Sequence, residues 1–164
     1  MTDAGRTTTV ALLAVSALWT GALAATPYAV SHGPADARVG RAAGLLYAAG
    51  SLICHQRPDR SYHPWGAQSP VCARCFGIYL AAPFGVALAL TASRRRRRSS
   101  RPTDDGRAMW RRIILLACVP TALTIAWEWT TGDMTPGLVR TWAGAALGGP
   151  VAAFIGAVAL GDVR

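Results

Sequence analysis

Four long apolar runs constrain the fold of this chain more than any other feature. They cover about residues 9–30, 71–92, 113–131 and 141–160 of the 164-residue sequence. Each is close to the roughly 17–25 residues that an α-helix needs to cross the hydrocarbon core of a bilayer. A soluble bundle of very apolar helices is the alternative, but a soluble domain does not need runs of this length. The sequence therefore predicts an all-α integral membrane helical bundle, with about four transmembrane helices in one domain over residues 1–164.

Arginine is concentrated between the second and third runs, and this predicts the topology. Residues 93–112 hold nine arginines against two aspartates. Short loops rich in arginine stay in the cytoplasm, so loop 93–112 is predicted inside and loop 31–70 is predicted to be extracytoplasmic. With four spans, both termini then lie in the cytoplasm, and the expected location is the inner (plasma) membrane of a bacterium. The first run could instead be read as a cleaved signal peptide, but its length favours a retained helix.

The net charge of +9 would ordinarily suggest a nucleic-acid partner. Here much of that charge sits in the short loop that anchors the topology, so no nucleic acid is expected. The lipid bilayer is the expected partner.

A fifth apolar segment, over residues 39–53, is interrupted by Arg41, Gly44 and Gly50. At about 15 residues it is too short to cross a bilayer comfortably, and an interfacial or re-entrant helix is the better interpretation. Such a helix would deliver Cys54 and His55 to the outer membrane surface.

Most of the cysteine and histidine of the chain lies between positions 54 and 75, where three of the four cysteines and two of the three histidines are found. Ser69-Pro70 is typical of a helix start, so the second span is predicted to begin just before Cys72. Cys72 and Cys75 then share one face within a single turn. The positive end of the helix favours the thiolate at Cys72, the form that binds metals and attacks disulfides.

Metal binding is the first interpretation of this cluster. Cys54, Cys72 and Cys75 with His55 form a Cys3His set of the kind that zinc prefers, and His63 is the substitute because adjacent ligands are geometrically awkward. A membrane thiol–disulfide oxidoreductase is the second interpretation. The third is a purely structural disulfide in a small-anion transporter. The sequence leaves all three open, and with them whether the protein is an enzyme.

Charged residues near the outer ends of the spans are expected to shape the same site. Glu128, the only glutamate, lies in the third run, and Arg140 opens the fourth. Ionisable groups inside spans are costly and suggest a function. The simpler interpretation is an ion pair between Glu128 and Arg140, and the sharper one makes Glu128 a further ligand or a proton acceptor. Arg57, Arg60 and Arg74 would add positive charge to the site.

Gly144 and Gly148 form a Gly-x-x-x-Gly pattern in the fourth run. Small residues at this spacing let another helix approach closely in a membrane. The partner helix belongs either to this chain or to a second copy, which would make a homo-oligomer.

Two motifs, CHQRP at 54–58 and CARC at 72–75, resemble a family of small bacterial membrane proteins catalogued as domain of unknown function 2085. Arg140 with Gly144 and Gly148 resembles the last helix of that family more weakly. The chain departs from the pattern at Phe76, where a small hydroxyl residue is expected, and in the Trp-Glu-Trp sequence around Glu128. The resemblance implies the membrane fold and the importance of the cysteine site, and no particular reaction.

Overall fold

The computed structural model describes residues 3–33, 36–96 and 106–163, and most of these residues are helical. They contain five α-helices: α1 (Asp3–Ser31), α2 (Ala37–Ile53), α3 (Ala73–Arg96), α4 (Gly106–Thr131) and α5 (Gly137–Ala159). Two short 3-10 turns, η1 (Pro58–Arg60) and η2 (Pro64–Gly66), lie between α2 and α3. Of the five helices in the described ranges, all but α2 are long and apolar enough to span a membrane. The predicted all-α bundle of four spans and one shorter helix is confirmed.

The arginine-rich segment predicted as a loop is helical at both of its ends. α3 continues to Arg96, and α4 begins at Gly106 rather than near residue 113. Arginine is a good helix former, so a helix does not have to stop where the apolar run ends. The rest of that loop, residues 97–105, lies outside the described residues.

Helix α3 begins later than the Ser69-Pro70 signal predicted. Its first residue is Ala73, because Cys72 forms an isolated antiparallel bridge with Ser61 and the segment before it is not helical. The backbone N–H of Ser69 donates to the carbonyl of Tyr62 at 2.7 Å, which ties the same segment to the loop. Ser69 is therefore not the N-cap, and the helix begins just after Cys72 and not just before it.

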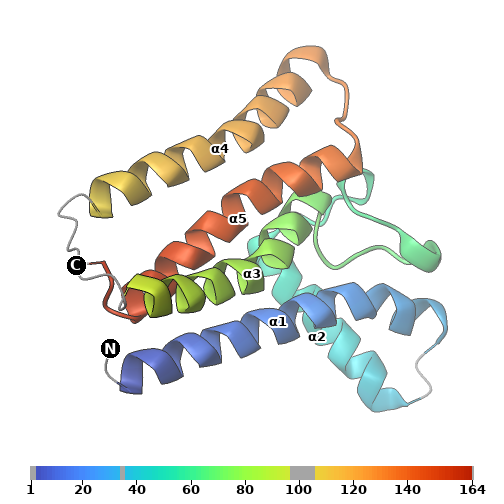
Figure 1. Cartoon of the computed structure of the whole chain (residues 1–164). Coiled ribbons are helices and arrows are strands. Elements are labelled where there is room, and N and C mark those ends of the chain that lie inside the picture. Colours follow the sequence, from blue (N-terminus) through green and yellow to red (C-terminus); the bar gives the residue numbers. More distant parts are fainter. Residues whose placement is uncertain (1–2, 34–35, 97–105, 164) are drawn as a thin grey trace.

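Helices α3 and α5 lie side by side and run in the same direction (Figure 1). Their contact is lined with glycine: a Cβ at Gly144 would lie 2.9 Å from the carbonyl carbon of Arg74, and a Cβ at Gly148 would lie 2.6 Å from the Cα of Ile78. Gly77 and Gly85 of α3 face the backbone of α5 in the same way. The close approach expected at Gly144 and Gly148 is thus made to a helix of the same chain. A homo-oligomer through these glycines stays a prediction.

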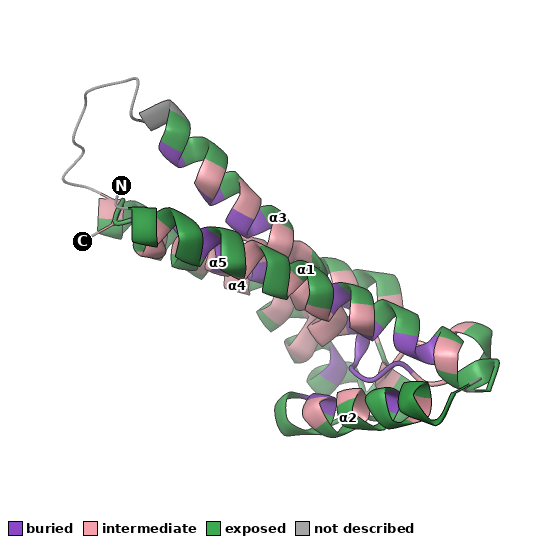
Figure 2. Cartoon of the chain, turned by 90° about the horizontal axis from the view of Figure 1, so that it is seen from below, coloured by how far each residue is buried: buried purple, intermediate pink, exposed green. Residues whose placement is uncertain are grey.

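The surface and the interior have the composition expected of a membrane bundle. Large apolar side chains such as Leu18, Leu116 and Trp129 are exposed, whereas the residues buried between helices are mostly Ala, Gly and Thr. Figure 2 shows exposed residues along the outer faces of the helices and buried ones where helices meet. In a bilayer, helices associate through small residues and interhelical hydrogen bonds. Thr20, whose Oγ1 donates to the carbonyl of Tyr79 at 2.7 Å, joins α1 to α3 in this way.

The two ends of the bundle differ in chemistry. The termini lie at one end, where α3 ends and α4 begins (Figure 1). α2, η1, η2 and the beginnings of α3 and α5 gather toward the other end, and α2 crosses α1 at an angle. This arrangement separates the arginine-rich ends of α3 and α4 from the cysteine segment along the length of the bundle.

Candidate functional site

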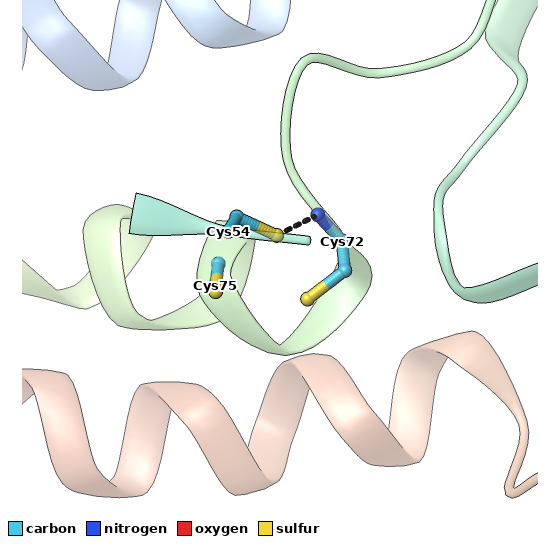
Figure 3. Close-up of side chains that lie close together, drawn as sticks. All are labelled: Cys54, Cys72 and Cys75. Carbon is cyan, nitrogen blue, oxygen red and sulfur yellow. Dashed lines mark hydrogen bonds between the residues drawn. The ribbon is translucent and has the colours of Figure 1, made fainter. Parts of the chain in front are cut away.

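Three cysteine side chains meet at the first turn of α3. The Sγ atoms of Cys54, Cys72 and Cys75 all lie within 4.8 Å of one another. Cys54 directly follows α2, Cys72 immediately precedes α3, and Cys75 lies in the first turn of α3 (Figure 3). Cys54 and Cys72 are buried, and Cys75 is partly buried. The structure thus brings together the three cysteines that were grouped from the sequence alone.

The backbone positions the sulfurs through hydrogen bonds. The N–H of Cys54 caps α2 by donating to the carbonyl of Gly50 at 2.9 Å. The N–H of Cys72 donates to the Sγ of Cys54 at 3.2 Å. Hydrogen bonds of this kind hold a ligand in place and stabilise negative charge on sulfur. The bond between the amide of Cys72 and the sulfur of Cys54 therefore joins the two segments directly.

Gln56 fastens the same two segments a second time, and sequence analysis did not identify this role. Its side-chain Nε2 donates to the carbonyls of Tyr47, in α2, and Pro70, ahead of Cys72, both at 2.7 Å. Its backbone has a φ of 47°, which turns the chain sharply after α2. A Cβ at Gly50 would lie 2.7 Å from the same Nε2, so glycine is needed there for the amide to reach both carbonyls. Only the place of Gln56 in the CHQRP motif could have drawn attention to it.

Apolar side chains surround the sulfur cluster. Leu23 of α1 and Val71 are fully buried against Cys54 and Cys72, and Trp19, Phe76 and Tyr79 pack around them. Such an environment excludes water and strengthens electrostatic interactions. A charge placed on these sulfurs therefore needs a close partner.

The chemistry of the cluster is that of free thiols. All four cysteines, each within the described residues, are unpaired, so the structural disulfide is not formed in this structure. Hydrogen bonds from the side chain and the backbone of Cys75 lower the pKa of the Cys72 thiol to about 5, against the opposing effect of burial. Tetrahedral zinc with bonds of about 2.3 Å separates its sulfur ligands by roughly 3.8 Å, within the 4.8 Å spread of the three Sγ atoms.

The histidines are placed differently from the cysteines. His55 is exposed, and its Nδ1 accepts a hydrogen bond from the backbone N–H of Arg57 at 3.3 Å. His63 is exposed as well and lines an apolar groove beside Tyr62 and Trp65. Among the described residues, the group of ligand atoms within 4.8 Å of one another contains the three cysteines and neither histidine. The assignment of His55 as a metal ligand stays a prediction.

Glu128 lies in a second cluster, formed with arginines. Its carboxylate is 3.4 Å from Arg74, 4.0 Å from Arg140 and 4.0 Å from Arg60. The predicted contact with Arg140 is present, but Arg74 is closer and also donates to Thr124 of α4 at 3.1 Å. Glu128 lies outside the group of sulfur ligands within the described part of the chain, and Arg57, at the surface, pairs with Asp59 at 3.4 Å.

Comparison with known proteins supports the resemblance seen in the motifs. The family described as predicted membrane protein DUF2085 matches residues 54–154, which begin at Cys54 and include α3, α4 and most of α5. An uncharacterised protein of Methanocaldococcus jannaschii is 56% identical over 41 residues, 25% of this chain and 26% of that protein. An uncharacterised protein of Methanothermobacter thermautotrophicus is 53% identical over 30 residues, 18% of this chain and 27% of that protein.

The matched segments span about a quarter of the length of these relatives. Both organisms are archaea. The resemblance was to a family of bacterial proteins, and these matches show that relatives of this chain also occur in archaea. No solved structure matches the chain. The family match covers well over half of the sequence and includes the cysteine cluster, the arginines around Glu128 and the glycine contact of α5. The chain therefore belongs to the predicted membrane protein family DUF2085.

Proposed function

We propose that this membrane protein binds one zinc ion through Cys54, Cys72 and Cys75, with His55 as the fourth ligand. The convergence of three free thiols within 4.8 Å, contributed by two separate segments, is the observation that carries the proposal. Zinc favours thiolate and imidazole ligands, and a closed set of four protein ligands is typical of structural rather than catalytic sites. The ion would hold the connection between α2 and α3 against the bundle.

The lowered pKa of Cys72 supports this proposal. A thiol must lose its proton to ligate a metal, and Cys72 does so well below neutral pH. The amide of Cys72 that donates to Cys54 supplies further stabilisation of a sulfur ligand. For His55 to complete the site, its Nδ1 has to give up the hydrogen bond from Arg57, an exposed contact of modest strength.

Metal content of the purified protein tests the proposal. Wild-type protein, expressed with zinc and purified in detergent, is expected to carry about one zinc per chain by elemental analysis. Cys72→Ser should lose the ion, because two thiolates and one imidazole leave an incomplete set. Cys118→Ser is the matched control, since Cys118 lies in α4, outside the sulfur group, and this variant should keep it. Equal zinc in wild type and Cys72→Ser, or none in either, contradicts the proposal.

A membrane thiol–disulfide oxidoreductase is the second candidate. It is favoured by the same lowered pKa, because a thiolate at Cys72 attacks disulfides readily and Cys75 lies one turn away to complete a disulfide. Metal-free protein that interconverts between a dithiol and a Cys72–Cys75 disulfide in glutathione buffers, as measured by thiol trapping and mass spectrometry, would favour this function over zinc binding.

We also propose that the cysteine site faces the exterior of a plasma membrane. The support is the high arginine content at the opposite end of the bundle, which the positive-inside rule assigns to the cytoplasm. A cysteine introduced at Trp65, which is exposed on η2, should react with an impermeant maleimide on intact spheroplasts. A cysteine introduced at Met109 of α4 should react only after lysis. The reverse pattern would overturn the assignment.

A further inference from the structure

The charges around Glu128 do not balance. Within the described ranges, three guanidinium groups, those of Arg60, Arg74 and Arg140, surround this one carboxylate. Their side chains are 22%, 14% and 8% exposed, and that of Glu128 is 2% exposed. Asp59, the next acid, is 46% exposed at the rim, where it contacts Arg57 as well as Arg60. Two positive charges therefore remain without a buried counterion.

The cluster also lacks hydrogen-bond acceptors. Four of its buried nitrogen atoms have no hydrogen-bond partner within the described parts of the chain: the Nε atoms of Arg60, Arg74 and Arg140, and Nη1 of Arg140. Buried guanidinium groups without acceptors are costly, and such atoms in a native protein point to a missing water or ion.

Glu128 cannot supply the missing acceptors. Its Oε1 already accepts a hydrogen bond from Thr135 at 2.6 Å. The distances from its carboxylate to the three arginines, 3.4–4.0 Å, are longer than the roughly 2.7–2.9 Å of a charge-assisted hydrogen bond. Arg74 Nη2 donates a long hydrogen bond of 3.4 Å to Oε1, but the four nitrogen atoms without a hydrogen bond are not satisfied by the carboxylate. An additional group with several acceptor oxygens would use the donors that remain.

We propose that Arg60, Arg74 and Arg140 form a binding site for a phosphate-type oxyanion. A dianion would neutralise the two excess charges, and tetrahedral oxygens match the forked donors of guanidinium groups. Arg140, the most buried of the three, forms the base of the site. Arg60, the most exposed, lies on η1 and forms its entrance.

This site is separate from the sulfur cluster, although Arg74 lies between Cys72 and Cys75 in sequence. The guanidinium of Arg74 contacts Thr124 and Glu128, both on α4. The sulfur atoms instead pack with Leu23 of α1. Anion binding therefore does not require the proposed metal, and Cys72→Ser protein should retain it.

The ligand is defined by its phosphate group, which could be free in solution or carried by an anionic lipid. The cluster is near the ends of the membrane-spanning helices, α4 ending at Thr131 and α5 beginning at Gly137, so a lipid headgroup as well as a soluble ion can approach it. Two assays distinguish these sources. One measures binding of radiolabelled inorganic phosphate to protein in phosphatidylcholine nanodiscs, and the other measures phosphatidylglycerol retained through delipidation, by native mass spectrometry.

The decisive variant is Arg60→Gln, since Arg60 is the least buried member and its replacement disturbs packing least. Losing its charge-assisted hydrogen bonds should weaken binding by about 10-fold or more. Arg57→Gln is the matched control: it removes the same charge three residues away, from a side chain that is 60% exposed and paired with Asp59. The affinity of Arg57→Gln for the probe should stay within about twofold of that of wild type. The assay in which Arg60→Gln and Arg57→Gln differ then identifies the ligand as free phosphate or as an anionic lipid.

Glu128→Gln makes the test independent of folding defects. Removing the competing negative charge should tighten oxyanion binding, and a misfolded protein would not bind more tightly. The proposal is overturned if wild-type protein binds neither probe, or if Arg60→Gln and Arg57→Gln bind both probes equally well. It also fails if Glu128→Gln is well folded and binds more weakly than wild type.

Discussion

Replacement of Gly148 by alanine tests the close contact between α3 and α5. The added Cβ would lie 2.6 Å from the Cα and 2.8 Å from the carbonyl carbon of Ile78, and closer still to its oxygen. Real Cβ contacts essentially never fall below 3.0 Å, so α3 and α5 must separate locally. Overpacking of this kind costs about 1–3 kcal/mol. At roughly 2–4 °C per kcal/mol for a chain of this size, the melting temperature should fall by about 2–12 °C.

The adjacent glycine provides the control. A Cβ at Gly149 would lie 3.7 Å from the Cβ of Ala81 and 4.0 Å from its carbonyl oxygen, and both distances are ordinary contacts. Gly149→Ala should therefore leave stability unchanged or raise it by up to about 1 kcal/mol, because alanine has the higher helix propensity. Both variants would be compared in the same detergent by thermal unfolding. Equal melting temperatures would refute the described packing of α3 on α5, as would a Gly148→Ala protein that changes its oligomeric state without losing stability.

Two further predictions concern the cysteine segment. Gln56→Ala removes both side-chain hydrogen bonds that join α2 to the segment before Cys72. It should lower the free energy of unfolding by about 1–3 kcal/mol, measured by thermal unfolding, and it should reduce the zinc content. Unchanged zinc content and stability would contradict the role given to this amide. In metal-free protein, the lowered pKa of Cys72 means that the folded state holds its proton less tightly than the unfolded chain. The stabilisation of the folded state that results is complete above about pH 9 and is lost as the pH falls toward 5. Between pH 8 and pH 5, the melting temperature of wild type should therefore fall more than that of Cys72→Ser.

The sequence was sufficient for the spans because the signal is local. A run of apolar residues long enough to cross a bilayer predicts a helix whatever surrounds it, and all four were found. The cysteine grouping was also predictable, since one helical turn brings Cys72 and Cys75 together and Cys54 directly follows the short helix α2. Arginine content did not locate the ends of α3 and α4, because the same residue that anchors a loop also continues a helix.

The features that the sequence did not specify depend on the rotation of helices about their axes and on the backbone conformation of the loop. The direction taken by His55 depends on the turn at Gln56, where a φ of 47° has no local signal such as glycine. The convergence of Arg60 and Arg74 on Glu128 depends on which face of α4 turns inward. Only Ala117 and Glu128 are buried among the described residues of that helix, so its apolar pattern does not define a face.

The first turn of α3 carries sulfur atoms on one side and, through Arg74, a contact with α4 on the other. A rigid turn shared in this way links events that occur on its two sides. If an ion at the sulfurs shifted the turn so that an anion among the arginines bound more tightly by some factor, thermodynamics would require the anion to tighten the metal by the same factor. Measuring the affinity for each ligand with the other present and absent would therefore give two values for one coupling, and they must agree.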